Sequence, residues 1–334
     1  MKGKMRFIVI FGILSILAAA LSGCGGKDQE KSSGKSSYPS KPVEFVVHTN
    51  PGDGVDLFIR TAADIINKEK LSSQPVNVVN KVGGSGAVAM GYVSGKEGDN
   101  HILITSQPST LTTPLRNNLG VGYKDFTPVC RVIAEESVVA VRADSPYKSM
   151  SDLIAAAKKA PKSISHGTGV LGAADTVLDF LISKATGAQF NIVSFKGGGE
   201  NIVALLGGNV DFVSVNPSEV IGQVEAGKVR LIGIASEKRL PKLPDVPTLK
   251  EQGIDVVFQS FRAVSGPKGM SPEAVKYWED VFKKVTQTEA WKKYLNDNMI
   301  SDVYCGSQEF GKYLDEQDKM YKEVLTEMGV LKKK

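Results

Sequence analysis

Residues 45–60 read FVVHTNPGDGVDLFIR and contain a strand, a turn and the start of a helix. The β-branched run at 43–48 predicts a buried strand, because such residues fit a pleated, half-buried surface. Residues 50–54 (NPGDG) form a turn, and apolar residues recur at helical spacing from Val55 onward. This order places unpaired N–H groups at a helix N-terminus, where a negatively charged ligand is favoured.

Three further Gly-rich segments repeat the order of strand, turn and helix start. They are residues 76–91 (VNVVNKVGGSGAVAMG), 163–177 (SISHGTGVLGAADTV) and 194–208 (SFKGGGENIVALLGG). Glycine that only closes a tight turn would explain any one of them. Because α/β proteins bind ligands in crevices at the carboxyl ends of strands, four such turns in one chain favour an anion-binding cleft.

Short apolar runs alternate with amphipathic segments along most of the chain. This βαβα order predicts parallel sheets covered by helices, and the length of residues 38–334 favours two domains. Ser271-Pro272-Glu273 is a good helix start, so the C-terminal part is predicted to be helical. The expected strands are 43–48, 76–80, 101–106, 137–142, 164–167, 210–215 and 230–235, and the expected helices are 55–67, 150–159, 173–186, 201–206, 218–226, 272–285 and 307–329.

The N-terminal residues indicate export. Residues 1–6 carry three positive side chains, and residues 7–21 are apolar apart from Ser15, a run too short for a spanning helix. The ending Leu-Ser-Gly-Cys24 resembles the lipobox of bacterial lipoproteins, which implies a signal peptide at 1–23 and lipid on Cys24. A signal peptide with a coincidental cysteine is the alternative. Residues 24–37, the lipidated cysteine and a Lys/Ser/Gly-rich segment, are expected to form a flexible tether.

Composition excludes several classes of partner. Part of the formal net charge of +5 belongs to the N-terminal segment, so a near-neutral folded part gives no reason to propose nucleic acid. Cys130 and Cys305 are either a disulfide of an exported protein or two isolated buried thiols. The three histidines are not at metal-ligand spacing, so neither a metal nor another cofactor is expected.

Two enzyme patterns overlap in the second Gly-rich turn. Residues 84–89 fit the dinucleotide pattern G-x-G-x-x-A, but the next strand ends in Thr105-Ser106-Gln107, without the acid that would bind a ribose. Residues 83–87 nearly fit the nucleophile elbow G-x-S-x-G around Ser85, with Ala87 in place of the last glycine. No histidine follows a convincing acid in the required order. An exported serine hydrolase using Ser85 is therefore kept as the alternative function.

An ordered set of motifs resembles one family over residues 38–331. The most specific of them is Leu-Pro-Asp-Val-Pro-Thr at 243–248. The chain resembles the extracytoplasmic solute-binding receptors of tripartite tricarboxylate transporters, also called Bug receptors. The segments that carry the resemblance are 38–47 (YPSKPVEFVV), 50–60 (NPGDGVDLFIR), 80–89 (NKVGGSGAVA), 125–132 (DFTPVCRV), 194–212 (SFKGGGENIVALLGGNVDF) and 226–253 (AGKVRLIGIASEKRLPKLPDVPTLKEQG).

The resemblance implies an α/β clamp of the type II periplasmic-binding-protein kind. Lobe 1 would comprise 38–140 plus 262–334 and lobe 2 would comprise 141–261, with a hinge and an interlobe ligand cleft. The ligand would be a small organic carboxylate, either a di- or tricarboxylate or an amino acid, delivered to a membrane permease without catalysis. The protein would be a monomer held by its lipid on the outer face of the cytoplasmic membrane, or periplasmic. A ligand sensor for a signalling partner is a further alternative.

The resemblance also implies the residues that line the cleft. Asp53 stands where the family usually has glycine, so it either points outward or contacts an ammonium on the ligand, and His48 stands where proline is common. Phe261 is expected to form a wall of the pocket. The expected ligand-binding residues are Asn50, Gly52, Asp53, Gly54, Asp56, Gly83, Gly84, Ser85, Gly86, Ala87, Ser106, Gln107, Gly167, Thr168, Gly169, Lys196, Gly197, Asn216, Phe261 and Arg262.

Overall fold

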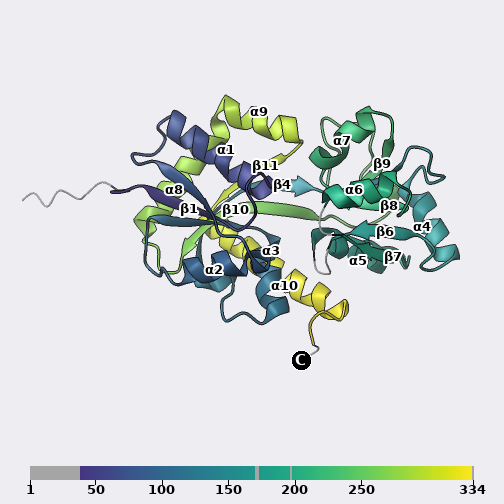
Figure 1. Cartoon of the computed structure of the whole chain (residues 1–334), viewed down its shortest axis with the longest axis horizontal. Helices are drawn as coiled ribbons and strands as arrows, with labels where there is room; N and C mark the ends of the chain where they lie inside the picture. The colour runs from purple at the N-terminus through teal and green to yellow at the C-terminus, as the bar shows by residue number, and fades with distance from the viewer. Residues whose placement is uncertain (1–37, 170–172, 196–197, 333–334) are drawn as a thin grey trace, which may run out of the picture. The chain divides into compact units, whose positions relative to one another are not determined.

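A computed structural model of the chain describes residues 38–169, 173–195 and 198–332. The expected signal peptide at 1–23, the lipidated Cys24 and the tether at 24–37 lie outside the described residues, as do Lys196 and Gly197. The described part contains two β-sheets, each with its own group of helices (Figure 1). None of its helices combines the length and the apolar character that a bilayer-crossing segment requires.

The first sheet has six strands in the order β11-β4-β10-β3-β1-β2. Strand β1 is parallel to both β2 and β3, whereas β10, β4 and β11 add to the edge of β3 as an antiparallel group. The strands of this sheet are β1 (Val43–Val47), β2 (Val76–Asn80), β3 (Ile102–Ser106), β4 (Phe126–Glu136), β10 (Gln259–Pro267) and β11 (Ser301–Gly306).

The second sheet has five strands in the order β7-β6-β8-β5-β9. Strand β6 is parallel to β7 and β8, and β5 is antiparallel to both of its neighbours. The strands of this sheet are β5 (Val138–Arg142), β6 (Ser165–Thr168), β7 (Asn191–Ser194), β8 (Phe212–Val215) and β9 (Val229–Ile234).

The helices divide between the sheets, as Figure 1 shows. Those near the second sheet are α4 (Met150–Lys159), α5 (Ala174–Thr186), α6 (Gly198–Leu206) and α7 (Pro217–Glu225). The others are α1 (Gly54–Lys68), α2 (Ala87–Ser94), α3 (Pro108–Asn117), α8 (Pro272–Gln287), α9 (Glu289–Asn298) and α10 (Ser307–Glu327). Together the sheets and helices form a two-lobed α/β fold.

The expectation of parallel sheets is only partly right. It holds within the β1–β3 and β6–β8 groups, but β4, β5, β9, β10 and β11 enter through antiparallel pairs. Strands β4, β10 and β11 were not among the expected elements. The expected lobe boundaries, 140/141 and 261/262, fall inside β5 and β10, whereas the chain changes sheet at Ser137 and just ahead of Gln259.

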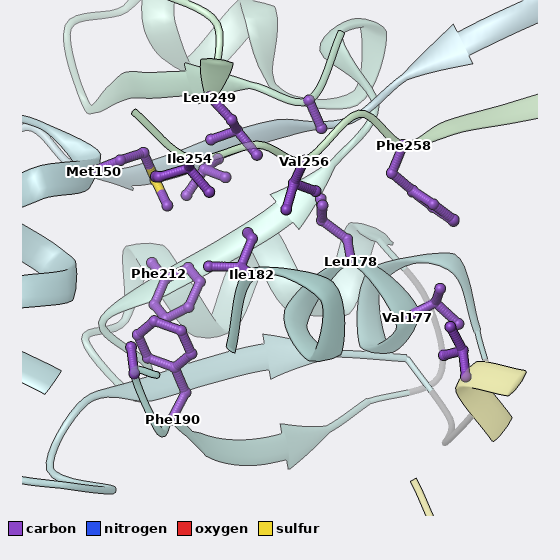
Figure 2. Close-up of a cluster of buried hydrophobic side chains, with 14 of the residues drawn as sticks. Met150, Val177, Leu178, Ile182, Phe190, Phe212, Leu249, Ile254, Val256 and Phe258 are labelled. Carbon is purple, nitrogen blue, oxygen red and sulfur yellow. The ribbon is translucent and has the colours of Figure 1, made fainter. Parts of the chain in front are cut away.

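Separate apolar clusters hold the sheets and helices together. Helix α1 buries Phe58 and Ile59 in the same cluster as Trp278 of α8 and Trp291 of α9, which lie at 0% exposure. The cluster beside the second sheet includes Leu178 and Ile182 of α5, which lie between Phe212 and the segment that carries Ile254 and Val256 (Figure 2). Burial at about 25 cal/mol per Å² makes these clusters the main source of stability.

The two cysteines beyond Cys24 are free thiols. Cys130 is fully buried in the cluster that contains Trp278, and Cys305 packs against the cluster that contains Phe310. In the β4–β11 pairing Cys130 is opposite Gly306 and Cys305 is opposite Arg131, which places neighbouring side chains on opposite faces of the sheet. The structure therefore agrees with two isolated thiols.

Candidate functional site

A cavity of about 340 Å³ lies where residues of both lobes meet the crossing strands. One side comes from the start of α1, the second Gly-rich turn and α3, and the other from the starts of α5 and α7. Its described lining consists of Val55, Ser85, Gln107, Pro108, Ser109, Thr112, Thr113, Arg116, Glu135, Ala173, Ala174, Asn216, Ser260 and Arg262. The volume suits a small organic molecule.

The first Gly-rich turn satisfies many of its own N–H groups. Asn50 N donates to Asp53 Oδ2 at 3.0 Å, Gly52 N donates to Asp56 Oδ2 at 2.8 Å, and Asp53 N donates to the Asn50 carbonyl at 3.1 Å. All three amides thus donate within the turn, two of them to its own carboxylates and one to a carbonyl, which argues against the expectation that they bind a ligand. In the described structure the N–H groups of Gly54 and Val55, at the start of α1, have no partner.

Asp56 is the centre of this internal network. Its carboxylate also accepts hydrogen bonds from Arg60 Nε at 2.8 Å and from Asn80 Nδ2 at 2.7 Å, and its side chain is 1% exposed. Burial raises the pKa of Asp56, but the bonds from Arg60, Gly52 and Asn80 outweigh burial and leave the pKa below its ordinary value. Asp56 therefore has a structural role. Asp53 is exposed, which agrees with the outward-pointing alternative.

The second Gly-rich turn is more open. The N–H groups of Gly86 and Ala87 donate to carbonyls of the turn itself, whereas those of Gly84 and Ser85 have no partner within the described ranges. Ser85 adopts a left-handed conformation, with φ 53°, that is uncommon for a residue other than glycine. Thr113 Oγ1 of α3 donates to the Ser85 carbonyl at 2.9 Å, which fixes the turn against the cavity wall.

His48 joins the two Gly-rich turns to α3. Its Nε2 lies 2.6 Å from Gln107 Nε2 and 3.1 Å from Ser109 Oγ, and its Nδ1 lies 3.2 Å from Thr105 Oγ1. A Cβ at Gly86 would come within 3.2 Å of the His48 ring. Burial, reinforced by the charge of Arg262, lowers the pKa of His48 to about 4, so the ring is neutral near pH 7.

A buried ion pair crosses the floor of the cavity. Arg262 Nε of β10 donates to Glu135 Oε2 of β4 at 3.0 Å, and both side chains are 9% exposed. Asn216 Nδ2, at the N-cap of α7, reaches the same oxygen at 3.3 Å, so Glu135 connects both lobes. A Cβ at Gly54 would lie 2.8 Å from Arg262 Nη2, so a larger residue there would displace the Arg262 side chain from its present position.

The expected residues of the second lobe are mostly occupied by internal contacts. Gly167 packs against Val210 and Val213, and the Gly169 N–H donates to Asp175 Oδ2. Desolvation raises the pKa of Asp175 despite that bond. Thr168 is fully buried. Of the described candidates in this lobe, Asn216 is the one that lines the cavity.

Two further expectations about the cleft need correction. Phe261 does not form a wall, because it is 0% exposed and packs against Phe310 and Tyr313 in the core. Side chains alternate along a strand, so Ser260 and Arg262 face the cavity while Phe261 faces the other way. Ser106 is buried and its Oγ lies 2.8 Å from Ser265 Oγ.

Several lining residues were missed by the sequence analysis. The most important is Arg116, a half-buried cation on α3 that forms no ion pair with any described acid. Ser109 is on the same helix, two residues after Gln107, so the helix start at Pro108 could have indicated it. In the described part of the chain, no three His, Cys, Asp or Glu side chains are arranged to hold a metal ion.

Comparison with known proteins gives one consistent result. A family model described as tripartite tricarboxylate transporter family receptor matches residues 58–330. A UPF0065 protein in the gbd 5' region of Cupriavidus necator is 30% identical over 331 residues, which covers 98% of this chain and 99% of that protein. Protein BugT of Bordetella pertussis is 28% identical over 76% of this chain and 79% of its own length.

A solved structure supports the same family assignment. The crystal structure of a TctC solute binding protein from Polaromonas aligns with a TM-score of 0.76 and 27% identity, covering 87% of this chain and 99% of that one. Membership of one family thus accounts for both the two-lobed fold and the motifs at 50–60, 80–89 and 226–253. The chain belongs to the tripartite tricarboxylate transporter receptor family, whose members are exported solute-binding receptors.

Proposed function

We propose that this receptor captures a small organic carboxylate in the cavity of about 340 Å³ and delivers it to the permease of a tripartite transporter. The observation that carries the proposal is Arg116, a half-buried guanidinium on the cavity wall that no described acid neutralises. A partly desolvated guanidinium gains most from a carboxylate, because the pair is charged, planar and bidentate. The family name, which specifies a tricarboxylate transporter, supports the same class of ligand.

Unpartnered N–H groups complete the grip on the carboxylate. Val55, Ser85 and Ser109 line the cavity, and each has a backbone N–H without a partner in the described structure. They belong to the start of α1, the second Gly-rich turn and the first turn of α3, where helix N-termini carry partial positive charge. We therefore assign carboxylate binding to the backbone N–H groups of Val55, Ser85 and Ser109 and to the Arg116 side chain, and no longer to residues 50–53.

The proposal includes the absence of catalysis. No histidine in the described part of the chain forms a hydrogen bond with Ser85 Oγ, so the hydrolase alternative lacks its base. Ser109 does lie 3.1 Å from His48 Nε2, but a pKa of about 4 makes that imidazole a weak base. Gln107 also competes for the same nitrogen at 2.6 Å.

The cellular setting belongs to the same proposal. The lipobox-like ending at 21–24 supports cleavage before Cys24 and lipid attachment there, which would hold the receptor on the outer face of the membrane. The receptor acts as a monomer whose lobes, approximately 38–140 plus 262–334 and 141–261, close over the ligand. Mass spectrometry of the mature N-terminus tests the lipid, and an acylated Cys24 is the expected result.

A thermal-shift screen of the purified full chain tests the ligand class. The panel contains citrate, succinate, adipate, benzoate and aspartate, with sodium chloride as the ionic-strength control. A true ligand at 100 times its Kd stabilises the folded state by about 2.7 kcal/mol. Unchanged melting temperatures across the whole panel would contradict the proposal.

A further inference from the structure

A second cavity of about 300 Å³ adjoins the first. The two cavities share Glu135, Asn216 and Arg262, so the buried ion pair is part of the lining of both. The described residues that line only the second cavity are Gly54, Leu57, Ser218, Glu219, Tyr294, Asn298 and Ile300. The second cavity thus extends the site of the proposed function toward α7 and α9.

The two cavities differ in the sign of their charge. The first contains Arg116 and Arg262 against Glu135, which leaves one cation in excess. The second contains Glu135 and Glu219 against Arg262, which leaves one anion in excess. A single ligand that reaches both cavities therefore meets a positive end and a negative end.

The second cavity contains two carboxylates with acceptor atoms that the described residues leave unused. Glu135 uses Oε2 for Arg262 and Asn216, and Glu219 uses Oε2 for the Asn216 N–H at 3.1 Å. Within the described structure the Oε1 atoms of both glutamates accept no hydrogen bond. Glu219 is exposed, yet desolvation and the nearby charge of Glu135 raise its pKa against the lowering by the Asn216 N–H bond. A cation placed between these carboxylates would relieve their repulsion.

Arg262 supplies a second and independent indication of a ligand. Its Nη1 is buried and has no hydrogen-bond partner among the described residues, although the side chain is only 9% exposed. Buried polar groups of native proteins are nearly always satisfied, so this donor calls for an acceptor that the protein does not provide. Arg262 also lines the first cavity, so the ligand carboxylate bound there is the acceptor that would satisfy it.

We propose that the ligand carries one carboxylate and a remote primary amine. The carboxylate binds beside Arg116 in the first cavity, and the ammonium binds between Glu135 and Glu219 in the second. This inference rests on the proposed function, because it assigns the far end of the same ligand. A dicarboxylate would place its second negative charge against Glu135 and Glu219, so it is disfavoured.

The experiment compares matched linear probes on the purified full chain. For each length from four to eight carbons, isothermal titration calorimetry measures an ω-amino acid, the monocarboxylic acid and the dicarboxylic acid. We expect the ω-amino acid to bind at least fivefold more tightly than both acids at the best length. A dicarboxylate that binds more tightly than the ω-amino acid at every length overturns the inference.

Glu219→Gln isolates the contribution of the carboxylate. Glutamine keeps the acceptor that caps α7, because Glu and Gln both serve at this position of a capping box, so the variant is expected to fold. It should abolish the fivefold preference for the amine and leave monocarboxylate affinity unchanged. Glu251→Gln is the matched control, since Glu251 also caps a turn, at Thr248, and lines neither cavity.

The possible results separate the two proposals. If monocarboxylates or dicarboxylates bind but the amine adds nothing, or if Glu219→Gln leaves the ranking unchanged, this inference fails and the carboxylate receptor stands. If no probe and no member of the wider panel binds, the proposed function fails and this inference falls with it. Loss of the preference in Glu219→Gln alone, with a melting temperature equal to that of the control, supports the inference.

Discussion

The two Gly-rich turns look alike in sequence but use their N–H groups differently. In the turn at 50–54, Asp53 and Asp56 accept the amides of Asn50 and Gly52, so the protein supplies the anions itself. In the turn at 83–87 no acidic residue is present, and the N–H groups of Gly84 and Ser85 stay open in the described structure. A Gly-rich turn before a helix is thus a potential anion site, and the neighbouring acids decide whether a ligand can use it.

Removing the Asp56 carboxylate, the internal anion of the first turn, should cause the largest loss of stability. Asp56→Ala leaves Gly52 N, Arg60 and Asn80 without their acceptor, and we expect a loss of about 3 kcal/mol in the free energy of unfolding. Urea unfolding measures it. Asp53→Ala is the control, because Asp53 is exposed and should cost less than 1 kcal/mol. Equal losses in the two variants would show that Asp56 is not the centre of the turn.

His48 connects the two turns and should make the protein sensitive to acid. Its folded pKa is about 4 and its unfolded pKa is 6.5, so the folded state favours the neutral ring. The contribution of the neutral His48 ring to the free energy of unfolding is fully present above pH 6.5 and is lost as the pH falls towards 4. Between pH 7.5 and pH 5 this side chain should account for about 2 kcal/mol.

His48→Gln tests this pH dependence. The variant should show a smaller loss of stability between the two pH values, as measured by urea unfolding at each. Comparing the slopes cancels the contribution of other groups, such as Asp56, that both proteins share. An unchanged slope would mean that His48 titrates normally in the folded state.

The role of Arg116 on α3, beside the open turn at 83–87, is tested by measuring carboxylate affinity. Arg116→Met is expected to weaken binding of the best carboxylate of the panel by at least tenfold, about 1.4 kcal/mol, because it removes a charged donor from the cavity. Calorimetry measures the affinity. Arg239→Met removes an exposed cation that pairs with Glu251, and its affinity should equal that of the unmodified chain. Similar weakening in both variants would point to general electrostatics instead of a local contact.

The smallest expected effect is the difference in stability between glycine and alanine at position 85. Because φ is 53°, glycine should be tolerated better than alanine, and we expect Ser85→Gly to be more stable than Ser85→Ala by about 1 kcal/mol. Thermal unfolding measures the difference. Both variants lose the hydroxyl and should therefore bind carboxylates similarly. If alanine is the more stable, the left-handed conformation is not maintained in solution.

Local patterns were sufficient for much of the fold. The strand-turn-helix order at 43–68 was predictable, because β-branched runs and helical periodicity are short-range signals. Strands β4, β10 and β11 were not, since their antiparallel pairing joins residues 126–136, 259–267 and 301–306, which are far apart in sequence. A pattern within one strand does not identify a distant partner.

The candidate site was predictable in outline. Of the expected residues, Ser85, Gln107, Asn216 and Arg262 line the first cavity, and Gly54 lines the second. Arg116 and Glu135 were missed because neither α3 nor β4, the elements that carry them, was expected. Expected residues that line neither cavity are Asn50, Gly52, Asp53, Asp56, Gly83, Gly84, Gly86, Ala87, Ser106, Gly167, Thr168, Gly169 and Phe261.

Only Ser137 separates β4, which belongs to the first sheet, from β5, which belongs to the second. The chain has almost no slack there, so any rotation of one sheet against the other must be absorbed by torsion angles within a few residues of Glu135. A ligand that contacts Glu135 therefore acts directly beside the segment where the lobes would rotate. In such a receptor, ligand binding and the angle between the lobes would be directly coupled.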